Sequence, residues 1–502
     1  MDQKKYKWKV RKKRIIFIAL PIIATFVMSV GVFISRAKIS GWLRFYGTNQ
    51  YRSNAPGSFR IMARKGKHSE PVDKLDAKIY LSTPDADILI GQGEKVPASR
   101  ATAVNVYFPR VKDGKYDLIW KIDSDMGKER WVTSVNLIKK PGDLKRYLES
   151  EAGGEDSNYE SYSSSRVQKD SEGLVVSLHP YNSRGIKPRV RDMLFIKAQH
   201  ADGKPARIKA RLKLKSGIIR VPTHGDCVPF VVKKNLNDCM VEVKEGQSLP
   251  FDFNTDILGL DSMSFYAMTH SVSFTIAYHQ VVDGKPKGPK SEIDFELGAI
   301  EDDTVIDFLP RILPANRKFS VNVMGFGRGP LYLDLYSDKA WNRGYVIPLQ
   351  NYFGKIILDT SGLNGFYKLQ YSLTYMPVVN LVANTTFYIS EYPESPEIIH
   401  KMVNKATRLE NLDQYTKKYL NYITKNRLAW KPGFKTSRDS HFFAGLLDQY
   451  HFAPTVMLDT KNINISKISK LQRNGQLIIL GIMTISGVIL ILIIFFATFY
   501  SL

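Results

Sequence analysis

The sequence predicts a mainly β protein, in which two or three β-sandwich modules are followed by an amphipathic helix and flanked by a transmembrane helix at each end. Three observations lead to this fold class. Two long uncharged segments lie near the two ends of the 502-residue chain. Between them, apolar and polar residues mostly alternate, as in a half-buried strand, and the period changes to about 3.6 after Pro393. With 44% hydrophobic residues, the chain has enough apolar material for several cores.

The first uncharged segment, residues 15–34, is long enough to cross a membrane. Its 20 residues, at about 1.5 Å each, match a hydrocarbon core of roughly 30 Å. Residues 1–14 carry eight Lys or Arg and one acid, so this basic tail is expected in the cytoplasm. A cleaved signal peptide is the alternative. Its apolar region is usually shorter, and Ser35-Arg36-Ala37 is a poor cleavage site.

The second uncharged segment, residues 477–500, has 24 positions without a charge and is too long and apolar for a buried core helix. If residues 1–14 are inside, the second span returns inward and the chain between the spans is extracytoplasmic. We therefore expect a two-pass protein of the cell inner membrane with its bulk in the periplasm or another extracytoplasmic space.

Aromatic and basic residues next to the spans bear on this topology. Trp42 and Tyr46, with Phe45, follow the first span and are expected to form an interfacial aromatic belt. Basic residues before Leu477, such as Arg473, argue for the opposite orientation because they lie on the outer flank. We expect the larger N-terminal cluster to dominate.

The charge of the chain restricts its partners. The net charge is +24, and the tail contributes +8 − 1 = +7, which leaves +17 for the remainder. A surplus this large on the outer side favours anionic neighbours such as lipid headgroups, an acidic polysaccharide or an acidic protein. We find no nucleic-acid motif, and nucleic acid is a poor candidate partner on that side of a membrane.

The chain contains two cysteines, Cys227 and Cys239. In an oxidising compartment this pair most simply closes a small loop as a disulfide. A metal site that includes His224 is the alternative, but it lacks a second close pair of ligands. We therefore predict a disulfide and no metal.

The first predicted sandwich module spans residues 58–140. The residues Tyr116, Leu118, Trp120 and Ile122 alternate and place four large side chains on one face of a strand. Residues 150–173 are rich in serine and acids and have little to bury. We expect this segment to be a flexible linker or a mobile loop.

A second β module is predicted over residues 174–300, which include both cysteines. Bases alternate with apolar residues from Arg207 to Leu214, which gives a strand one buried and one cationic face. A candidate anion-binding surface follows from this pattern, with the side chains Lys209, Arg211, Lys213 and Arg220. A solvated strand face is the alternative, because charges commonly protect sheet edges.

The third module, residues 301–392, contains a local echo of the first. The windows Gly114 to Ile122 and Gly365 to Leu373 share the pattern Gly-x-Tyr-x-Leu-x-aromatic-x-aliphatic. This pattern resembles the "tyrosine corner" strand of immunoglobulin-like sandwiches, in which the tyrosine hydroxyl bonds to nearby backbone. The intersheet Cys and Trp signature of true immunoglobulins is missing, so the resemblance implies only an Ig-like sandwich class.

A helical segment is predicted over residues 395–450. Ser395 can cap a helix and Pro396 suits its first position. Apolar residues then recur at three- and four-residue steps up to Ile423, which predicts one amphipathic helix of about 28 residues. Its apolar stripe can pack within the chain or bind a partner.

Motifs of catalysis are absent from the sequence. It has no Gly-x-Ser-x-Gly, no His-Glu-x-x-His and no phosphate-binding loop. The carboxylates Asp252, Asp256 and Asp261 lack the glycine and the terminal glutamate of an EF-hand. We therefore predict no enzyme, and no catalytic, cofactor-binding or metal-binding residues.

These observations lead to an expected function. We expect a non-enzymatic scaffold or accessory subunit of a cell-envelope membrane complex, whose partners are other subunits bound through the transmembrane helices and the β modules. A binding module for an anionic envelope polymer is the first alternative. A membrane-anchored envelope hydrolase without a recognisable motif is the second.

Overall fold

The computed structural model describes residues 41–463 with gaps, together with isolated positions from 473 to 488. The gaps are residues 66–69, 98, 149–165, 170–172, 182–185, 225–226, 228, 233–238, 299–303, 308, 326–328, 373–383, 411, 429–435 and 462. The predicted tail 1–14, the first predicted span and most of the second lie outside the described residues. Among the residues that are described, no helix combines the length and the hydropathy needed to cross a membrane.

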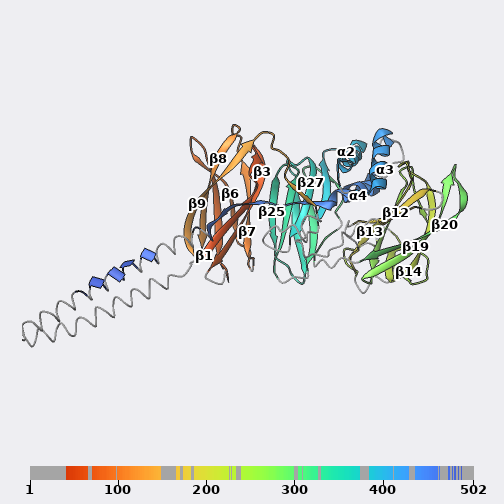
Figure 1. The fold of residues 1–502 in the computed structure, drawn as a ribbon, viewed down its shortest axis with the longest axis horizontal. Coiled ribbons are helices and arrows are strands. Elements are labelled where there is room, and N and C mark those ends of the chain that lie inside the picture. Colours follow the sequence, from red (N-terminus) through yellow and green to blue (C-terminus); the bar gives the residue numbers. More distant parts are fainter. Residues whose placement is uncertain are drawn as a thin grey trace, which may run out of the picture.

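The described chain is mainly β and builds three sheet-based modules (Figure 1). Module 1 contains β1 (Gly41–Gly47), β2 (Gln50–Arg52), β3 (Ala55–Lys65), β4 (Glu70–Pro71), β5 (Leu75–Ser82), β6 (Asp87–Glu94), β7 (Ala101–Phe108), β8 (Gly114–Ser124), β9 (Gly127–Ile138) and β10 (Arg146–Leu148). Its main sheet has the order β2-β9-β8-β5-β6-β7-β3-β1. Side chains from all of these strands meet in one apolar core.

Alternation explains the strands of module 1. In β8 the side chains of Leu118, Trp120 and Ile122 are almost completely buried, as the sequence predicts. The indole nitrogen of Trp120 donates a hydrogen bond to Oγ1 of Thr133 on β9, at 2.7 Å, which satisfies the polar group that this large side chain takes into the core.

Module 1 starts at Gly41, earlier than the predicted residue 58. The prediction of an interfacial aromatic belt after the first span is wrong. Phe45 points into the core of module 1, whereas Trp42 and Tyr46 point to the other side of β1 and join a second apolar cluster. All three aromatic side chains are buried. The reason is that β1 is covered on both faces, which a period of two cannot reveal.

Module 2 contains β11 (Arg166–Lys169), β12 (Leu174–Pro180), β13 (Asp192–His200), β14 (Ile208–Ser216), β15 (Ile218–Pro222), β16 (Met240–Lys244), β17 (Phe253–Asn254), β18 (Leu260–Ala267), β19 (Ser271–Val282) and β20 (Lys285–Gly298). The strands form sheets of order β11-β12-β13-β18-β15-β16 and β17-β14-β19-β20. Both sheets contribute to one apolar core, as in a β-sandwich.

Part of the predicted linker 150–173 is a strand. Residues 166–169 form β11, which pairs with β12 at the edge of module 2. The serine-rich residues 149–165 lie outside the described residues.

Module 3 contains β21 (Thr304–Ile306), β22 (Ile312–Pro314), β23 (Lys318–Gly325), β24 (Leu331–Ser337), β25 (Trp341–Ile347), β26 (Phe353–Asp359), β27 (Gly365–Ser372) and β28 (Asn384–Ser390). Sheets of order β21-β23-β26 and β22-β28-β27-β24-β25 enclose its core. The hydroxyl of Tyr116 in module 1 donates to the carbonyl oxygen of Lys112 at 2.9 Å. Tyr367 takes the matching place in β27 and is buried in the core of module 3.

Two helices stand where the sequence predicts one long helix. The helical segment contains α2 (Pro396–Ala406), α3 (Gln414–Lys425), α4 (Thr436–Leu446) and the 3-10 helix η4 (Leu447–Gln449). The break follows from local capping, because the side chain of Asp413 accepts a hydrogen bond from the backbone nitrogen of Thr416 and starts α3 anew. The apolar stripe packs within the chain, in an apolar cluster that also contains residues of all three modules.

The chain then returns to its starting point. After η4 come β29 (Tyr450–Phe452), which pairs with β10, and β30 (Thr455–Asp459), which pairs with β1 at the edge of the main sheet of module 1. In space, module 3 lies between module 1 and module 2, and the helical segment lies along modules 3 and 2 (Figure 1). The first and last parts of the described fold therefore lie side by side.

Candidate functional site

The four predicted cations of module 2 do not form one surface. Lys209, Arg211 and Lys213 lie on β14 with exposed side chains. Arg220 lies on β15, which belongs to the other sheet, and its guanidinium pairs with Glu242 at 2.9 Å. The candidate anion-binding surface is therefore reduced to Lys209, Arg211 and Lys213 of β14. Local periodicity shows which face a residue takes but not which sheet its strand joins.

A carboxylate neutralises part of this row. Asp252 accepts a hydrogen bond from Nε of Arg211 at 2.7 Å, and its other oxygen lies 3.4 Å from Nζ of Lys209. The hydrogen bond from Arg211 is the main cause that holds the pKa of Asp252 below its usual value. Lys213 makes no ion pair with any residue that the structure describes. Because Asp252 pairs with two of the three cations, only Lys213 is left to bind an anion, and one lysine makes a weak anion site.

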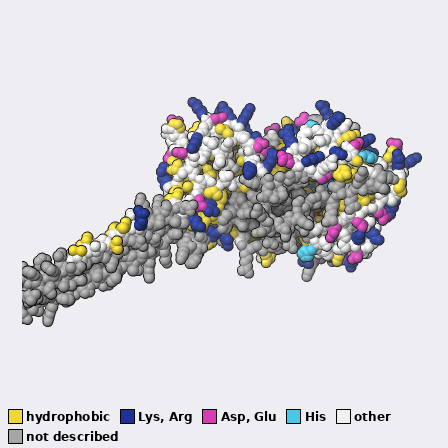
Figure 2. Space-filling view, in the orientation of Figure 1, with side chains coloured by type: hydrophobic (Ala, Val, Ile, Leu, Met, Phe, Trp, Pro, Cys, Tyr) yellow, Lys and Arg dark blue, Asp and Glu magenta, His cyan; other side chains and the backbone are white. Residues whose placement is uncertain are grey.

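The same face carries acids two strands away. The outward side chains of β20 include Glu292, Asp294 and Glu296, and β19 separates them from β14 with the uncharged Ser273 and Thr275. Strands lie about 4.8 Å apart, so a polyanion bound across β14 would meet the acidic row within roughly 10 Å. Figure 2 shows basic and acidic side chains intermixed over module 2 in this view.

The predicted disulfide is present. Cys227 and Cys239 are bonded, with their Cα atoms 5.8 Å apart. Phe230, within the closed loop, packs against Val305 and Met324 of module 3. The disulfide therefore holds a loop that forms part of the junction between modules 2 and 3. His224 is exposed at the start of this loop, and the described residues include no group of three side chains suited to hold a metal ion.

A serine and a histidine are hydrogen-bonded on β12. Oγ of Ser177 lies 2.8 Å from Nε2 of His179, and burial lowers the pKa of His179 to about 3, so its ring is neutral. In an open cleft, such a pair suits a nucleophile and its base. Ser177 is 0% exposed, however, and the ring of Phe442 from α4 lies edge-on against His179 at 5.2 Å. This pair is part of the packing between module 2 and the helical segment.

Buried ion pairs hold the helical segment against the modules. Arg311 of module 3 pairs with Asp448 of η4 at 2.8 Å, and both side chains are buried. Burial alone would lower the pKa of Arg311, but the charge of Asp448, the hydrogen bond to it and Tyr181 together outweigh burial and raise this pKa, so the guanidinium keeps its proton. Arg438 of α4 reaches module 2 in the same way, through an ion pair with Asp256.

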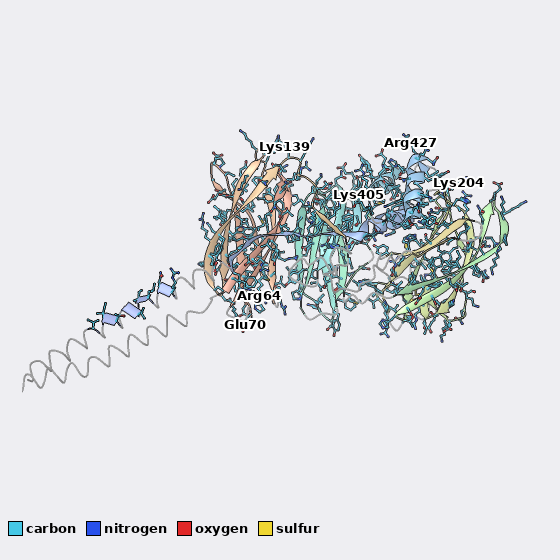
Figure 3. The ribbon with its side chains drawn as sticks, in the orientation of Figure 1. Arg64, Glu70, Lys139, Lys204, Lys405 and Arg427 are labelled. Atoms are coloured by element: carbon cyan, nitrogen blue, oxygen red, sulfur yellow. A yellow bond between two sulfur atoms is a disulfide. The ribbon has the colours of Figure 1, made fainter. Side chains whose placement is uncertain are left out.

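A buried lysine of module 3 binds η4 and β29, which begin the segment that returns to module 1. Nζ of Lys368 on β27 donates to the backbone carbonyl of Leu447 at 2.9 Å and to that of Tyr450. The same ammonium lies 3.9 Å from the centre of the Tyr450 ring. A second lysine, Lys405 of α2, is labelled in Figure 3. It pairs with Asp338 at the turn between β24 and β25 of module 3.

The junction of modules 1 and 3 also contains a buried ion pair. Arg60 of β3 pairs with Asp334 of β24 at 2.6 Å, and the side chains are 0% and 1% exposed. The guanidinium also stacks near the ring of Trp341, at 5.3 Å from its centre. Burial raises the pKa of Asp334 to about 6, and Arg60 opposes this rise only in part.

A small cavity lies at the same junction, lined by Glu94, Thr102, Tyr345 and Lys355 among others. Its volume is about 250 Å³, below the roughly 300–1,000 Å³ of ordinary ligand pockets. We therefore assign no small-molecule site to it.

Sequence reasoning missed the charges at these junctions. Isolated charges in alternating strands look like solvent-facing residues, and Arg60 and Arg311 carry no other signal. Asp334 does carry one, because it interrupts an apolar run from Leu331 to Tyr336 in which both neighbours are Leu. A charge in a strand whose two faces are both apolar indicates a buried partner.

The fold and its surfaces thus define a class: a mainly β chain of three sheet-based modules, fastened together by a helical segment and buried ion pairs. No family model matches the sequence, and no curated protein matches it.

Solved structures give only distant likenesses. Trypsin-activated alpha-2-macroglobulin from Escherichia coli aligns with 70% of this chain and 24% of its own, at 11% identity and a TM-score of 0.17. The Escherichia coli adhesin FdeC aligns with 70% of this chain and 97% of its own, at 9% identity and a TM-score of 0.15. The ICAM-5 D1–D4 fragment aligns with 70% of this chain and 77% of its own, at 8% identity and a TM-score of 0.14. The chain spans about a quarter of the macroglobulin chain that it matches. Scores this low assign no family.

Proposed function

We propose that this protein is a non-enzymatic scaffold or accessory subunit of a cell-envelope membrane complex. Residues 15–34 and 477–500 span the inner membrane, the tail 1–14 lies in the cytoplasm, and the three modules stand on the extracytoplasmic side as Ig-like sandwiches. Other subunits bind through the two spans and the exposed faces of the modules.

One observation carries this proposal: the chain enters and leaves its fold at the same place. Strands β1 and β30 pair antiparallel, with Arg44 opposite Asp459. The two side chains form an ion pair at 2.5 Å. A fold with this closure suits a chain that is held in one bilayer at both ends, because the two flanking segments start next to each other. A part fixed in this way is suited to an assembly.

Two tyrosines support the Ig-like class. Tyr116 bonds to the backbone carbonyl four residues upstream, as in a tyrosine corner. Tyr116 and Tyr367 are each the third residue of a strand whose first residue is a glycine.

The test is co-purification from native membranes. The turn at Asp283 and Gly284, between β19 and β20, is exposed, so the affinity tag is inserted there. We expect the tagged protein to stay in the membrane fraction after carbonate washing and to bring down a fixed set of proteins. A control carries the same tag and spans, with residues 41–460 replaced by an unrelated domain. Recovery in the soluble fraction, or the same proteins with the control, would contradict the proposal.

The topology is tested at the same turn. In an Asp283→Cys variant, the native cysteines stay paired with each other, so the new thiol is the one that reacts. We expect a membrane-impermeant maleimide to label it in intact spheroplasts. Labelling only after the membrane is opened would reverse the proposed orientation.

Anionic-polymer binding by β14 is the first alternative, and it receives less support because Asp252 and the acids of β20 oppose it. We expect an Arg211→Glu, Lys213→Glu double variant to elute from an acidic-polysaccharide column at the same salt concentration as the wild type. Elution of the variant at clearly lower salt would favour the polymer-binding alternative.

The second alternative is an envelope hydrolase. Its best candidate pair, Ser177 and His179, is sealed by α4. We give it no mechanism.

A further inference from the structure

The outer face of four neighbouring strands in module 1 is ordered in rows. One row is apolar and crosses β6, β5, β8 and β9 through the directly opposed residues Leu89, Tyr80, Ile119 and Val132. The two ends of the row, Leu89 and Val132, are 48% and 47% exposed, whereas Ile119 in its middle is 5% exposed and Tyr80 is partly exposed. All four point away from the core of module 1, which lies on the other face of the sheet.

The next row, two residues along each strand, is cationic. Lys78 of β5 lies opposite Lys121 of β8, and Lys121 lies opposite Arg130 of β9. All three side chains are exposed. The ammonium of Lys121 lies 4.3 Å from the ring centre of Tyr80, so the two rows touch.

The three cations make no ion pair with any residue that the structure describes. The nearest acids on this face are Glu94, Asp76 and Asp123, which lie opposite one another one row further. Lys74 binds Asp76 and Asp123, at 3.4 Å and 3.2 Å. Like charges directly opposite each other on neighbouring strands destabilise a sheet. The sequence thus places unpaired cations where folding alone disfavours them.

The spacing of the rows fits a helix. Neighbouring strands lie about 4.8 Å apart, close to the roughly 5.4 Å rise of one helical turn. A helix laid across the strands would set side chains at i, i+4 and i+7 over successive strands. The two rows are about 7 Å apart along the strands, which is the distance between adjacent stripes of one helix.

We propose that this face, the Lys121 face, docks an amphipathic helix of a partner protein that carries an acidic stripe beside an apolar stripe. The acids cover Lys78, Lys121 and Arg130, and the apolar side chains cover the row from Leu89 to Val132. This inference rests on the proposed scaffold function and names the chemistry of one partner. The charge of the cationic row favours an acidic partner. The apolar row disfavours a polysaccharide, because a polysaccharide would leave the apolar side chains exposed to water.

The Lys121 face lies on the module from which the chain leaves its fold. Met126, in the turn between β8 and β9, lies against Gly41 at the start of β1. Arg64 and Glu70, labelled in Figure 3, mark this end of module 1. A partner helix on the Lys121 face therefore lies on the module that contains Gly41, where the described fold begins.

The test uses the full-length protein and a designed helical peptide of about 18 residues, with Glu at i, i+4 and i+7 and Leu on the adjacent stripe. Binding is followed by fluorescence anisotropy of the labelled peptide. We expect a Lys121→Glu, Arg130→Glu double variant to bind at least about tenfold more weakly. A Leu89→Ser, Val132→Ser variant should also bind several-fold more weakly.

Two controls make the result specific. A Lys209→Glu, Lys213→Glu variant changes the same charge on module 2 and should bind like the wild type. A peptide with the same composition but no stripes should not bind. Three outcomes would overturn the inference. They are an equal loss of affinity in the module 2 variant, equal binding of the two peptides, and no binding of the striped peptide to the wild type.

A photocrosslinker in place of Val132, activated in native membranes, provides the second measurement. A crosslink to an acidic amphipathic helix that disappears in the Lys121→Glu, Arg130→Glu background supports the inference. Crosslinks to lipid, to sugar or to a segment without acids overturn it. If the tagged protein still brings down a fixed set of proteins in that case, the scaffold function stands and only this surface is wrongly assigned.

Discussion

Buried charged residues lie at the contacts between the modules of this protein. Arg60 and Asp334 are removed from water at the junction of modules 1 and 3, and Arg311 and Asp448 at the contact of module 3 with η4. Such pairs add little net stability over apolar residues of the same size, but an unpaired member is costly. They therefore favour one arrangement of the modules over others.

The pair between Arg60 and Asp334 gives the first prediction. An Asp334→Leu variant leaves Arg60 buried without its partner, and we expect the free energy of unfolding to fall by about 3–5 kcal/mol. The double variant Arg60→Met, Asp334→Leu should regain most of this loss. Urea unfolding measures both. A single variant as stable as the wild type would show that this ion pair does not hold the junction.

A buried carboxyl in module 2 gives a dependence on pH. Burial raises the pKa of Asp192 to about 7, against an ordinary value of 3.8. Between these values the folded protein holds a proton that the unfolded chain releases. The resulting stability is fully present below pH 3.8 and is lost as the pH rises through 7.

The second prediction follows from this fall of stability with rising pH. Between pH 5 and pH 8, we expect the wild type to lose about 2–3 kcal/mol more stability than an Asp192→Asn variant, which cannot titrate at this position. Subtracting the variant's pH profile removes the effects of other groups, such as His179. Parallel profiles over this range would contradict the raised pKa.

At the scale of elements, the helical segment is positioned by close backbone contacts as well as by its apolar stripe. Gly203, in the turn after β13, has a φ of +96°, and a Cβ there would lie 2.4 Å from the carbonyl oxygen of Lys418 in α3. The next residue of α3, Tyr419, donates its hydroxyl to the carbonyl of Leu258 in module 2 at 2.7 Å. Glycine therefore allows α3 to lie directly on module 2. Lys204, beside this turn, is labelled in Figure 3.

The third prediction is that Gly203→Ala displaces α3. Gly246→Ala is the matched control, because Gly246 also has a positive φ, of +81°, but a Cβ there meets nothing within 4 Å. We expect the control to cost about 1 kcal/mol from backbone strain and Gly203→Ala clearly more. Hydrogen exchange in α3 should rise only in the Gly203 variant. The same exchange in both variants would rule out the steric explanation.

At the scale of the whole molecule, the order of modules in space differs from their order in the chain. Module 3 lies between modules 1 and 2, and the segment after η4 runs back along module 3 to pair β29 with β10 and β30 with β1 (Figure 1). The two halves of the chain are thereby joined by sheet pairing as well as by the covalent connection between modules 1 and 2.

The fourth prediction tests this closure. Residues 1–160 and 161–502, expressed together as two chains, should purify as one complex, because β30 completes the sheet of module 1 and Asp334 still pairs with Arg60. A second chain that ends at residue 449 lacks β29 and β30 and should be recovered in clearly lower yield with the first. Independent elution of the two full halves would show that the junctions are weak.

The sequence by itself determined the features that depend on neighbours along the chain. The alternation of Leu118, Trp120 and Ile122 determined a buried strand face, because side chains on a strand alternate between its two faces. The spacing of Cys227 and Cys239 allowed one short disulfide loop. Both features are present in the structure.

Only the tertiary structure decided which surfaces meet. It placed Arg220 on a different sheet from Arg211, buried Trp42 on the second covered face of β1, and paired Arg44 with Asp459 across 415 residues. It also aligned Lys78, Lys121 and Arg130, which come from three separate strands. A local period records which side a residue faces and carries no information on what covers that side, because the covering residues lie hundreds of positions away.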